Sequence, residues 1–154
     1  MKPLIRRANA NDAVRVRFVL HQAHKQNTQI GFRFPAAGIS LSRVRHNLRK
    51  DAYFVLVSKQ QILGVIAVRR RQRQWQIGSL GLLQGCRKQG YGSKLLRFGE
   101  QRIRASGGGW AFLLTPRKHP YLPNYYRRRG YQGLRVVHFH HISWLLMGKK
   151  LVWR

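Results

Sequence analysis

A strand-like segment, a glycine-containing loop and a helix-like segment follow one another without a break near the middle of the chain. Trp75–Leu83 has the composition of a strand, and Ser93–Ala105 has Leu96, Gly99 and Ile103 at helical spacing. A helix therefore begins almost directly where a strand ends. The first amides of such a helix have no intrahelical acceptor, and the helix dipole favours an anion beside them.

The connection between these two segments reads Arg87-Lys88-Gln89-Gly90-Tyr91-Gly92. Glycine allows positive φ and a close backbone approach to a ligand, and the two cations add positive charge. We therefore predict that the junction binds a phosphate group. The P-loop spacing Gly-x-x-x-x-Gly-Lys-[Ser/Thr] and the dinucleotide spacing Gly-x-Gly-x-x-Gly are both absent, so neither of those sites is expected. A tight turn without a ligand remains the alternative.

The rest of the chain alternates between strand and helix patterns. Asn9 with Asp12 resembles a capped helix start, and Ser40 caps a second helix. The segment Gln26–Ile39 reads as a loop whose apolar residues Ile30, Phe32 and Phe34 pack over a pocket. Further strands are predicted at Leu4–Ala8, Ala52–Ser58, Ile62–Arg70, Trp110–Thr115, Tyr131–Phe139 and Ile142–Leu151, and further helices at Asp12–Lys25 and Asn124–Arg129.

This order predicts a mixed α/β fold in one domain covering residues 1–154, with a mixed central sheet of about six to seven strands flanked by about four helices. Cys86 is the single cysteine, so no internal disulfide can form. The chain shows neither a signal-peptide pattern nor an apolar run long enough to span a bilayer. We expect a soluble, cytoplasmic protein.

The junction and two later segments together resemble the GNAT superfamily of acyl-CoA-dependent N-acyltransferases. Ile77–Leu82, the loop Arg87–Gly92 and the following Ser93–Leu96 look like its acyl-CoA-binding motif. Tyr125–Tyr131 is similar to its second motif, and Trp144–Leu151 to its last strand. The resemblance covers essentially the whole chain. It implies transfer of an acetyl group from acetyl-CoA to a primary amine by direct attack in a ternary complex, without a metal.

The resemblance also implies roles for individual residues. Tyr126 matches the tyrosine that protonates the departing thiolate. Gln76 stands where some relatives have a glutamate as general base, and glutamine cannot take a proton, so the base is elsewhere, a water chain or absent. The residues implied to contact acetyl-CoA are Leu82, Gln84, Arg87, Lys88, Gln89, Gly90, Tyr91, Gly92, Ser93 and His119.

His138, His140 and His141 look like a metal cluster, but neighbours on alternate faces of a strand cannot converge on one ion, so no metal site is expected. Cys86 is read as a spacer in the loop rather than a nucleophile. The amine acceptor is not identified by any motif. A homodimer through the C-terminal strands is left open.

Charge is the most unusual property of the chain, with 31 Lys and Arg against three acids and a formal net charge of +28. Non-specific binding of polyanions and nucleic acid follows from that charge alone. One hypothesis is that an ordinary acyltransferase surface has been supercharged by engineering or compositional drift, since Arg43 and Arg127 sit at helix starts that favour acids. The alternative is a functional charge, in a nucleic-acid-binding module or a tRNA-directed acetyltransferase on the same fold.

Overall fold

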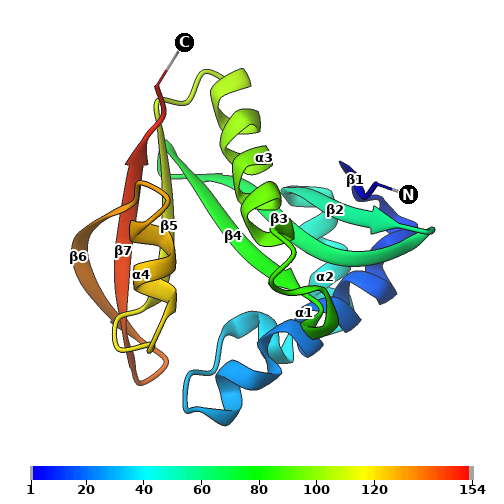
Figure 1. Cartoon of the computed structure of the whole chain (residues 1–154), viewed down its shortest axis with the longest axis horizontal. Helices are drawn as coiled ribbons and strands as arrows, with labels where there is room; N and C mark the ends of the chain where they lie inside the picture. The colour runs from blue at the N-terminus through cyan, green and yellow to red at the C-terminus, as the bar shows by residue number, and fades with distance from the viewer. Residues whose placement is uncertain (1, 153–154) are drawn as a thin grey trace.

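A computed structural model describes residues 2–152 and places seven strands in one sheet of order β1-β2-β3-β4-β5-β7-β6 (Figure 1). All neighbouring strands are antiparallel except β4 and β5, which run parallel. The strands are β1 Leu4–Arg7, β2 Ala52–Ser58, β3 Gln61–Arg71, β4 Gln74–Leu82, β5 Trp110–Pro116, β6 Gln132–Phe139 and β7 Ile142–Lys150. The α-helices are α1 Ala13–Gln29, α2 Leu41–Lys50, α3 Tyr91–Ala105 and α4 Leu122–Arg127. The predicted fold class is confirmed.

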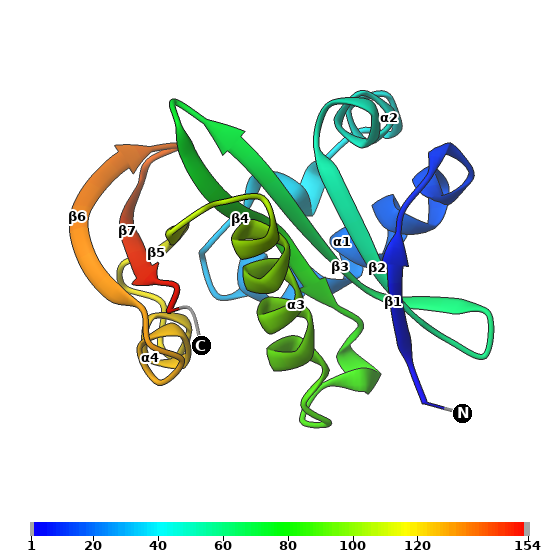
Figure 2. The same cartoon turned by 90° about the horizontal axis from the view of Figure 1, so that it is seen from above.

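Helices cover both faces of the sheet because its central strands are apolar on both sides. In β2, Phe54 and Leu56 pack into a core with α3, while Tyr53 and Val55 face a second core with α1 and α2. This is the period of two expected of a strand buried on both faces. Figure 2 shows α1 and α2 on one side of β2–β4 and α3 on the other. None of the helices within residues 2–152 has the length and apolar composition needed to cross a bilayer.

β4 and β5 diverge, and this divergence opens the sheet in its middle. They pair only between Gln76 and Phe112, and Figure 1 shows them separating from there. The pairing of β4 with β3 is also interrupted, because the register shifts between Val65–Gly81 and Ala67–Gly78. Ser79 lies inside this bulge with a φ of +47°, a conformation that non-glycine residues rarely adopt. The bulge bends β4 at the point where it leaves β5.

The main differences from the sequence predictions lie at helix ends. α1 continues to Gln29 rather than stopping at Lys25, because Asn27 is buried against partners that are remote in sequence. α3 begins at Tyr91, two residues early, directly after Gly90. α4 begins at Leu122 rather than Asn124, since a proline is tolerated in a first helical turn.

The predicted start of the first helix is confirmed. The side chain of Asn9 accepts from the amide of Asn11 at 2.9 Å, and Asp12 accepts from the amide of Asn9 at 2.8 Å. This capping box closes a 3₁₀ turn that leads into α1.

The three acidic side chains of the chain are all buried, with exposures of 6–8%. Each is paired with a cation at 2.8–3.0 Å, and Glu100 also accepts a hydrogen bond from the Tyr131 hydroxyl. The pairs are Asp12 with Arg6, Asp51 with Arg71, and Glu100 with Lys149. Every exposed charged side chain of residues 2–152 is therefore basic.

Candidate active site

The strand-to-helix junction carries amides that no helical carbonyl accepts. The amide of Lys94 donates to the carbonyl of Gly90 at 3.0 Å and starts the hydrogen-bond ladder of α3. The amides of Tyr91, Gly92 and Ser93 come before that bond and lack an intrahelical acceptor. The free donors expected from the sequence are thus present, at the positive end of a 15-residue helix.

Two glycines in the junction are favoured for different reasons. Gly90 has a φ of +80°, and no atom lies within 4 Å of the position a Cβ would take. Its left-handed conformation favours glycine, and the space beside it is open. At Gly92 a Cβ would lie 3.0 Å from the hydroxyl of Tyr125, so a larger residue would push against α4. The junction has room for a ligand on its Gly90 side.

The side chains around the junction lie in different environments. Arg87 donates to the carbonyl of Ala23 at 2.7 Å and to the Gln26 side chain at 2.9 Å, which ties the loop to α1. Lys88 and Gln89 are exposed. The guanidinium predicted to lie beside a phosphate is thus engaged with the end of α1, and Lys88 is the cation of this pair that is open to solvent.

The other predicted contacts lie before and after these residues. Leu82 ends β4, and Gln84 is exposed in the short 3₁₀ turn Gln84–Cys86. The hydroxyl of Ser93 accepts from Arg129 of the segment after α4 at 2.9 Å. A hollow of about 410 Å³ lies there, lined by Ser93, Leu96, Arg97, Glu100, Arg128 and Arg129. Three of its six lining residues are arginines, so this space between α3 and the end of α4 suits an anionic group.

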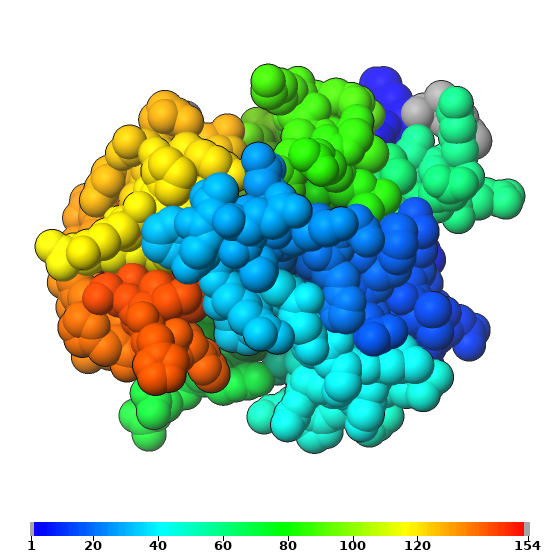
Figure 3. Space-filling model, turned by 90° about the horizontal axis from the view of Figure 1, so that it is seen from below, coloured from blue at the N-terminus to red at the C-terminus, as the bar shows by residue number. Residues whose placement is uncertain are grey.

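A cavity of about 270 Å³ lies between the diverging strands β4 and β5. Aromatic rings connect the elements around it: His24 stacks on Phe34 at 4.7 Å, Phe34 meets Trp144 edge-on at 5.3 Å, and Trp144 stacks on Phe139 at 4.8 Å. These rings come from α1, the segment after it, β7 and β6. Figure 3 shows the same segments, with α1 and residues 26–39 in blue against the yellow loop after β5 and the orange β6–β7 turn. The segment expected to cover a pocket does so.

Tyr126 of α4 also lines this cavity. Its ring packs edge-on against Tyr125 at 5.2 Å and Tyr131 at 5.9 Å. Burial raises the pKa of its hydroxyl, and Tyr125 adds to the rise, so the group stays protonated at neutral pH. Within residues 2–152 no group hydrogen-bonds that hydroxyl. Tyr126 therefore presents a protonated, unpartnered phenol to the cavity.

A hydrogen-bond relay fixes the state of His24, which the sequence reading did not single out. His119 accepts at Nδ1 from the amides of Tyr121 and Leu122, so its Nε2 carries the proton that it donates to Asn27 at 2.8 Å. The Asn27 amide then donates to Nδ1 of His24 at 3.3 Å. The neutral His24 must carry its proton on Nε2, which is buried and makes no well-formed hydrogen bond in the described part of the chain, although the Leu80 backbone acts on the ring.

Burial and the charge of Arg87 together lower the pKa of His24 to about 4, against an opposing effect of the Leu80 backbone. Burial also lowers the pKa of His119. His119 is only 5% exposed and uses both ring nitrogens within the protein. Its predicted contact with acetyl-CoA stays a prediction, and the structure shows it joining α1 to the β5–α4 loop.

The polar lining of the cavity is basic or neutral. Gln76 lies in the wall, together with Arg69 and Ser79, and no acidic residue is among the lining residues. No side chain of the cavity can therefore serve as a carboxylate base. Within residues 2–152, no three His, Cys, Asp or Glu side chains group closely enough to hold a metal ion. Arg69 carries no motif, and Ser79 lies within the motif segment Ile77–Leu82 without a role implied for its side chain, so the sequence did not single out either residue.

The fold agrees with comparisons to known proteins. The family model for the acetyltransferase (GNAT) domain matches residues 16–151. The chain belongs to the GNAT acetyltransferase family. This GNAT chain is 31% identical over 141 residues to S-(2-succino)cysteine N-acetyltransferase of Bacillus subtilis, with 85% of each protein covered. It is 25% identical over 142 residues to S-alkylcysteine N-acetyltransferase of the same organism, covering 84% of this chain and 78% of that one.

Solved structures show the same GNAT fold at lower identity. PaiA N-acetyltransferase from Thermoplasma acidophilum, in complex with coenzyme A, superposes with a TM-score of 0.84 at 14% identity, covering 98% of this chain and 100% of that chain. N-acetylglutamate synthase from Neisseria gonorrhoeae, complexed with coenzyme A and N-acetyl-glutamate, gives a TM-score of 0.80 at 15% identity, covering 99% of this chain and 36% of that one.

Proposed function

We propose that this GNAT protein transfers an acetyl group from acetyl-CoA to the primary amine of a small acceptor. The proposal rests on the positions of two features relative to β4. Open helix amides lie at the end of β4, and a cavity with a protonated Tyr126 lies beside the same strand. The names of the two curated relatives make S-substituted cysteines the first acceptors to test.

The donors at the junction fit the phosphates of acetyl-CoA. The amides of Tyr91–Ser93 and the helix dipole supply a site for a diphosphate, and the open space beside Gly90 leaves room for it. The basic hollow between α3 and the end of α4 adds positive charge nearby. Leu82, Gln84, Lys88 and Gln89 complete the proposed contact surface.

The reaction supported by this geometry is direct transfer in a ternary complex. The acceptor nitrogen forms a bond to the acetyl carbonyl carbon, the carbon–sulfur bond breaks, and the products are an amide and free CoA thiol. Tyr126 donates its proton to the departing sulfur and regains one from solvent. The amine proton leaves to water, since the cavity lining has no carboxylate and Gln76 cannot accept a proton.

The test is steady-state formation of CoA from acetyl-CoA with a panel of S-substituted cysteines, polyamines, aminoglycosides and peptide N-termini. Chromatographic detection avoids thiol reagents that would react with Cys86. Turnover of an amine supports the proposal, and absence of both turnover and acetyl-CoA binding overturns it.

Tyr126→Phe is expected to lower kcat by about 10²-fold or more with little change in CoA affinity, because only the transferable proton is lost. Tyr121→Phe is a matched control on an exposed ring at the start of α4. A Tyr126→Phe enzyme with unchanged kcat removes this residue from the mechanism.

A nucleic-acid role is the competing reading of the charge. Its test is acetyl-CoA binding by calorimetry at high salt, where non-specific polyanion binding is screened. Binding that persists in the micromolar range supports the enzyme. Loss of acetyl-CoA binding, with nucleic-acid binding retained, supports the module.

A further inference from the structure

Arg69 reaches from β3 across β4 to the wall of the cavity. Its guanidinium lies against the main chain at Gly78, where a Cβ would come within 2.8 Å of Nη2 and 2.9 Å of Cζ. The absence of a side chain at Gly78 thus makes space for a cation beside the diverging strands. The Arg69 side chain is 26% exposed, so it is held in place yet open to a ligand.

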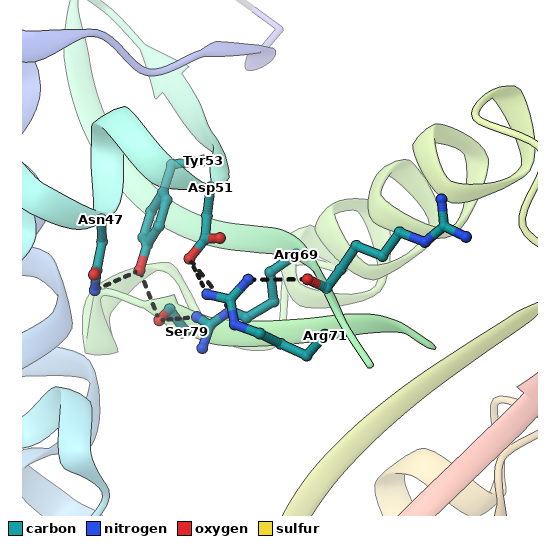
Figure 4. A network of polar contacts seen from close by, with 7 residues as sticks. Asn47, Asp51, Tyr53, Arg69, Arg71 and Ser79 are labelled. Atoms are coloured by element: carbon teal, nitrogen blue, oxygen red, sulfur yellow. Dashed lines mark hydrogen bonds and ion pairs between the residues drawn. The ribbon is translucent and has the colours of Figure 1, made fainter. Parts of the chain in front are cut away.

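The charge of Arg69 is only weakly balanced. Asp51 approaches its Nε at 3.8 Å, beyond hydrogen-bond distance, while the same carboxylate oxygen accepts from Arg71 at 2.9 Å (Figure 4). One carboxylate is therefore shared between two guanidinium groups. The hydrogen bond that Arg69 makes runs from Nη2 to the hydroxyl of Ser79 at 3.2 Å. Its Nε is buried without an acceptor among the described residues.

Ser79 is fixed beside Arg69 by a second chain of contacts. The amide of Asn47 donates to the Tyr53 hydroxyl at 3.4 Å, and that hydroxyl lies 3.3 Å from the hydroxyl of Ser79 (Figure 4). If the donor direction continues along this chain, Ser79 accepts from both Tyr53 and Arg69. Its own proton is then free to be donated into the cavity. The bulge in β4 places this hydroxyl at the wall.

The remaining walls are apolar apart from His24, Gln76 and Tyr126. Phe34, Phe112, Leu114, Phe139, Trp144 and Leu146 line the cavity, and no acid does. A cationic acceptor such as a polyamine would meet an unbalanced guanidinium there and no counter-charge. A carboxylate would instead meet the guanidinium donors of Arg69 that the Ser79 hydrogen bond leaves unused, with apolar surface left for a side chain.

We propose that the acceptor is a small amine that carries a carboxylate and an apolar substituent, and that Arg69 and Ser79 bind the carboxylate. This inference rests on the proposed acetyltransferase function and adds the class of acceptor and the residues that select it. Arg69 is here a substrate-binding residue and takes no part in proton transfer.

The test compares two acceptors that differ only in the carboxylate: an S-alkylcysteine and the matching 2-(alkylthio)ethylamine. Wild-type kcat/KM is expected to be about tenfold or more higher for the amino acid, because a site built for hydrogen bonds rejects an analogue that cannot fill them. Arg69→Gln is expected to raise KM for the amino acid about tenfold or more while changing kcat/KM for the amine by less than about twofold. Arg69→Lys keeps the charge, and its KM for the amino acid is expected to lie between the values of the wild type and Arg69→Gln.

Arg70→Gln is the matched control, because it removes the same charge from the next residue of β3. Arg70 is exposed on the opposite face, with its guanidinium over Trp75. The Arg70→Gln variant is expected to keep the wild-type preference for the amino acid over the amine. Circular dichroism melts check that each variant is folded. Equal wild-type activity on both acceptors, or an unchanged preference in Arg69→Gln, overturns this inference and leaves the acetyltransferase function intact.

If no amine is turned over, a measurement of acceptor binding still tests this inference. Calorimetry with the S-alkylcysteine in the presence of CoA is expected to show binding that Arg69→Gln abolishes and Arg70→Gln retains. Binding that is the same in all three proteins, or absent from the wild type, overturns the inference. If the wild type also fails to bind acetyl-CoA, the proposed acetyltransferase function itself has failed.

Discussion

Acid is expected to destabilise this protein chiefly through the buried His24. Its pKa of about 4 in the folded state lies below the ordinary value of 6.5, so the unfolded state binds more protons between these two values. The contribution of neutral His24 to stability is complete above pH 6.5 and is lost as the pH falls toward 4. One pKa unit corresponds to about 1.36 kcal/mol, so the full loss is about 3 kcal/mol, of which about 2 kcal/mol falls between pH 7 and pH 5.

Few other groups obscure this effect. The chain has three carboxylates, and Arg6 holds the pKa of one of them, Asp12, below its usual range by hydrogen bonding. Protonation of Asp12 therefore contributes little above pH 5. The pKa of His119 is also lowered by burial, so it acts in the same direction and leaves a residual slope when His24 is removed.

The assay is urea unfolding, followed by tryptophan fluorescence at pH 7 and pH 5 and at constant, high ionic strength. His24→Gln is expected to remove most of the loss in the free energy of unfolding between the two pH values. His46→Gln on α2, an exposed position, is expected to keep the wild-type loss. If His24→Gln loses as much stability as the wild type, the buried neutral imidazole and the relay that fixes it are wrong.

Three further outcomes are expected. Gly90→Asp should abolish CoA binding, because it places a negative charge at the junction. Gly90→Asn has the same size as Gly90→Asp and tolerates positive φ, so it should retain binding that calorimetry can measure. Equal CoA affinities of the two variants would contradict the phosphate assignment. Raising sodium chloride from about 50 to 500 mM should raise Tm by several degrees, because screening weakens repulsion within a chain of net charge +28; a salt-independent Tm would contradict this. The hydroxyl of Ser40 already accepts a hydrogen bond from the Arg43 amide at 3.1 Å, so Arg43→Glu should complete a capping box. This variant should raise the free energy of unfolding, measured in urea melts, by about 0.5–1 kcal/mol. A decrease in that free energy would count against the cap.

Local signals in the sequence were sufficient for most of the fold. The strands β2 and β3 were found because adjacent apolar residues serve opposite cores, and α3 was found from its helical spacing, although it begins at Tyr91 rather than at Ser93. The end of α1 was missed because it is set by a contact between Asn27 and His119, which lie 92 residues apart. No local pattern encodes such a partner.

The cavity was less accessible to sequence reasoning than the junction. The junction is one continuous segment, so its donors could be located from spacing. The cavity instead collects His24, Arg69, Ser79, Tyr126 and Trp144 from five elements of the fold. Of these, Tyr126 was identified because a family motif surrounds it. The others depend on how the β4 bulge and the α1 segment meet, which only the tertiary structure determines.

The three acids that the chain keeps bear on the origin of its charge. Asp12, Asp51 and Glu100 are each buried and paired, and no exposed acid occurs in residues 2–152. Leaving a buried hydrogen-bonding group without its partner costs about 1–3 kcal/mol, whereas most surface substitutions change stability by less than about 0.5 kcal/mol. If acids were replaced wherever stability allowed it, these three would be retained and the exposed acids would be lost. The supercharging hypothesis requires this pattern. A charge selected for one nucleic-acid partner would instead concentrate on one face and leave acids elsewhere on the surface.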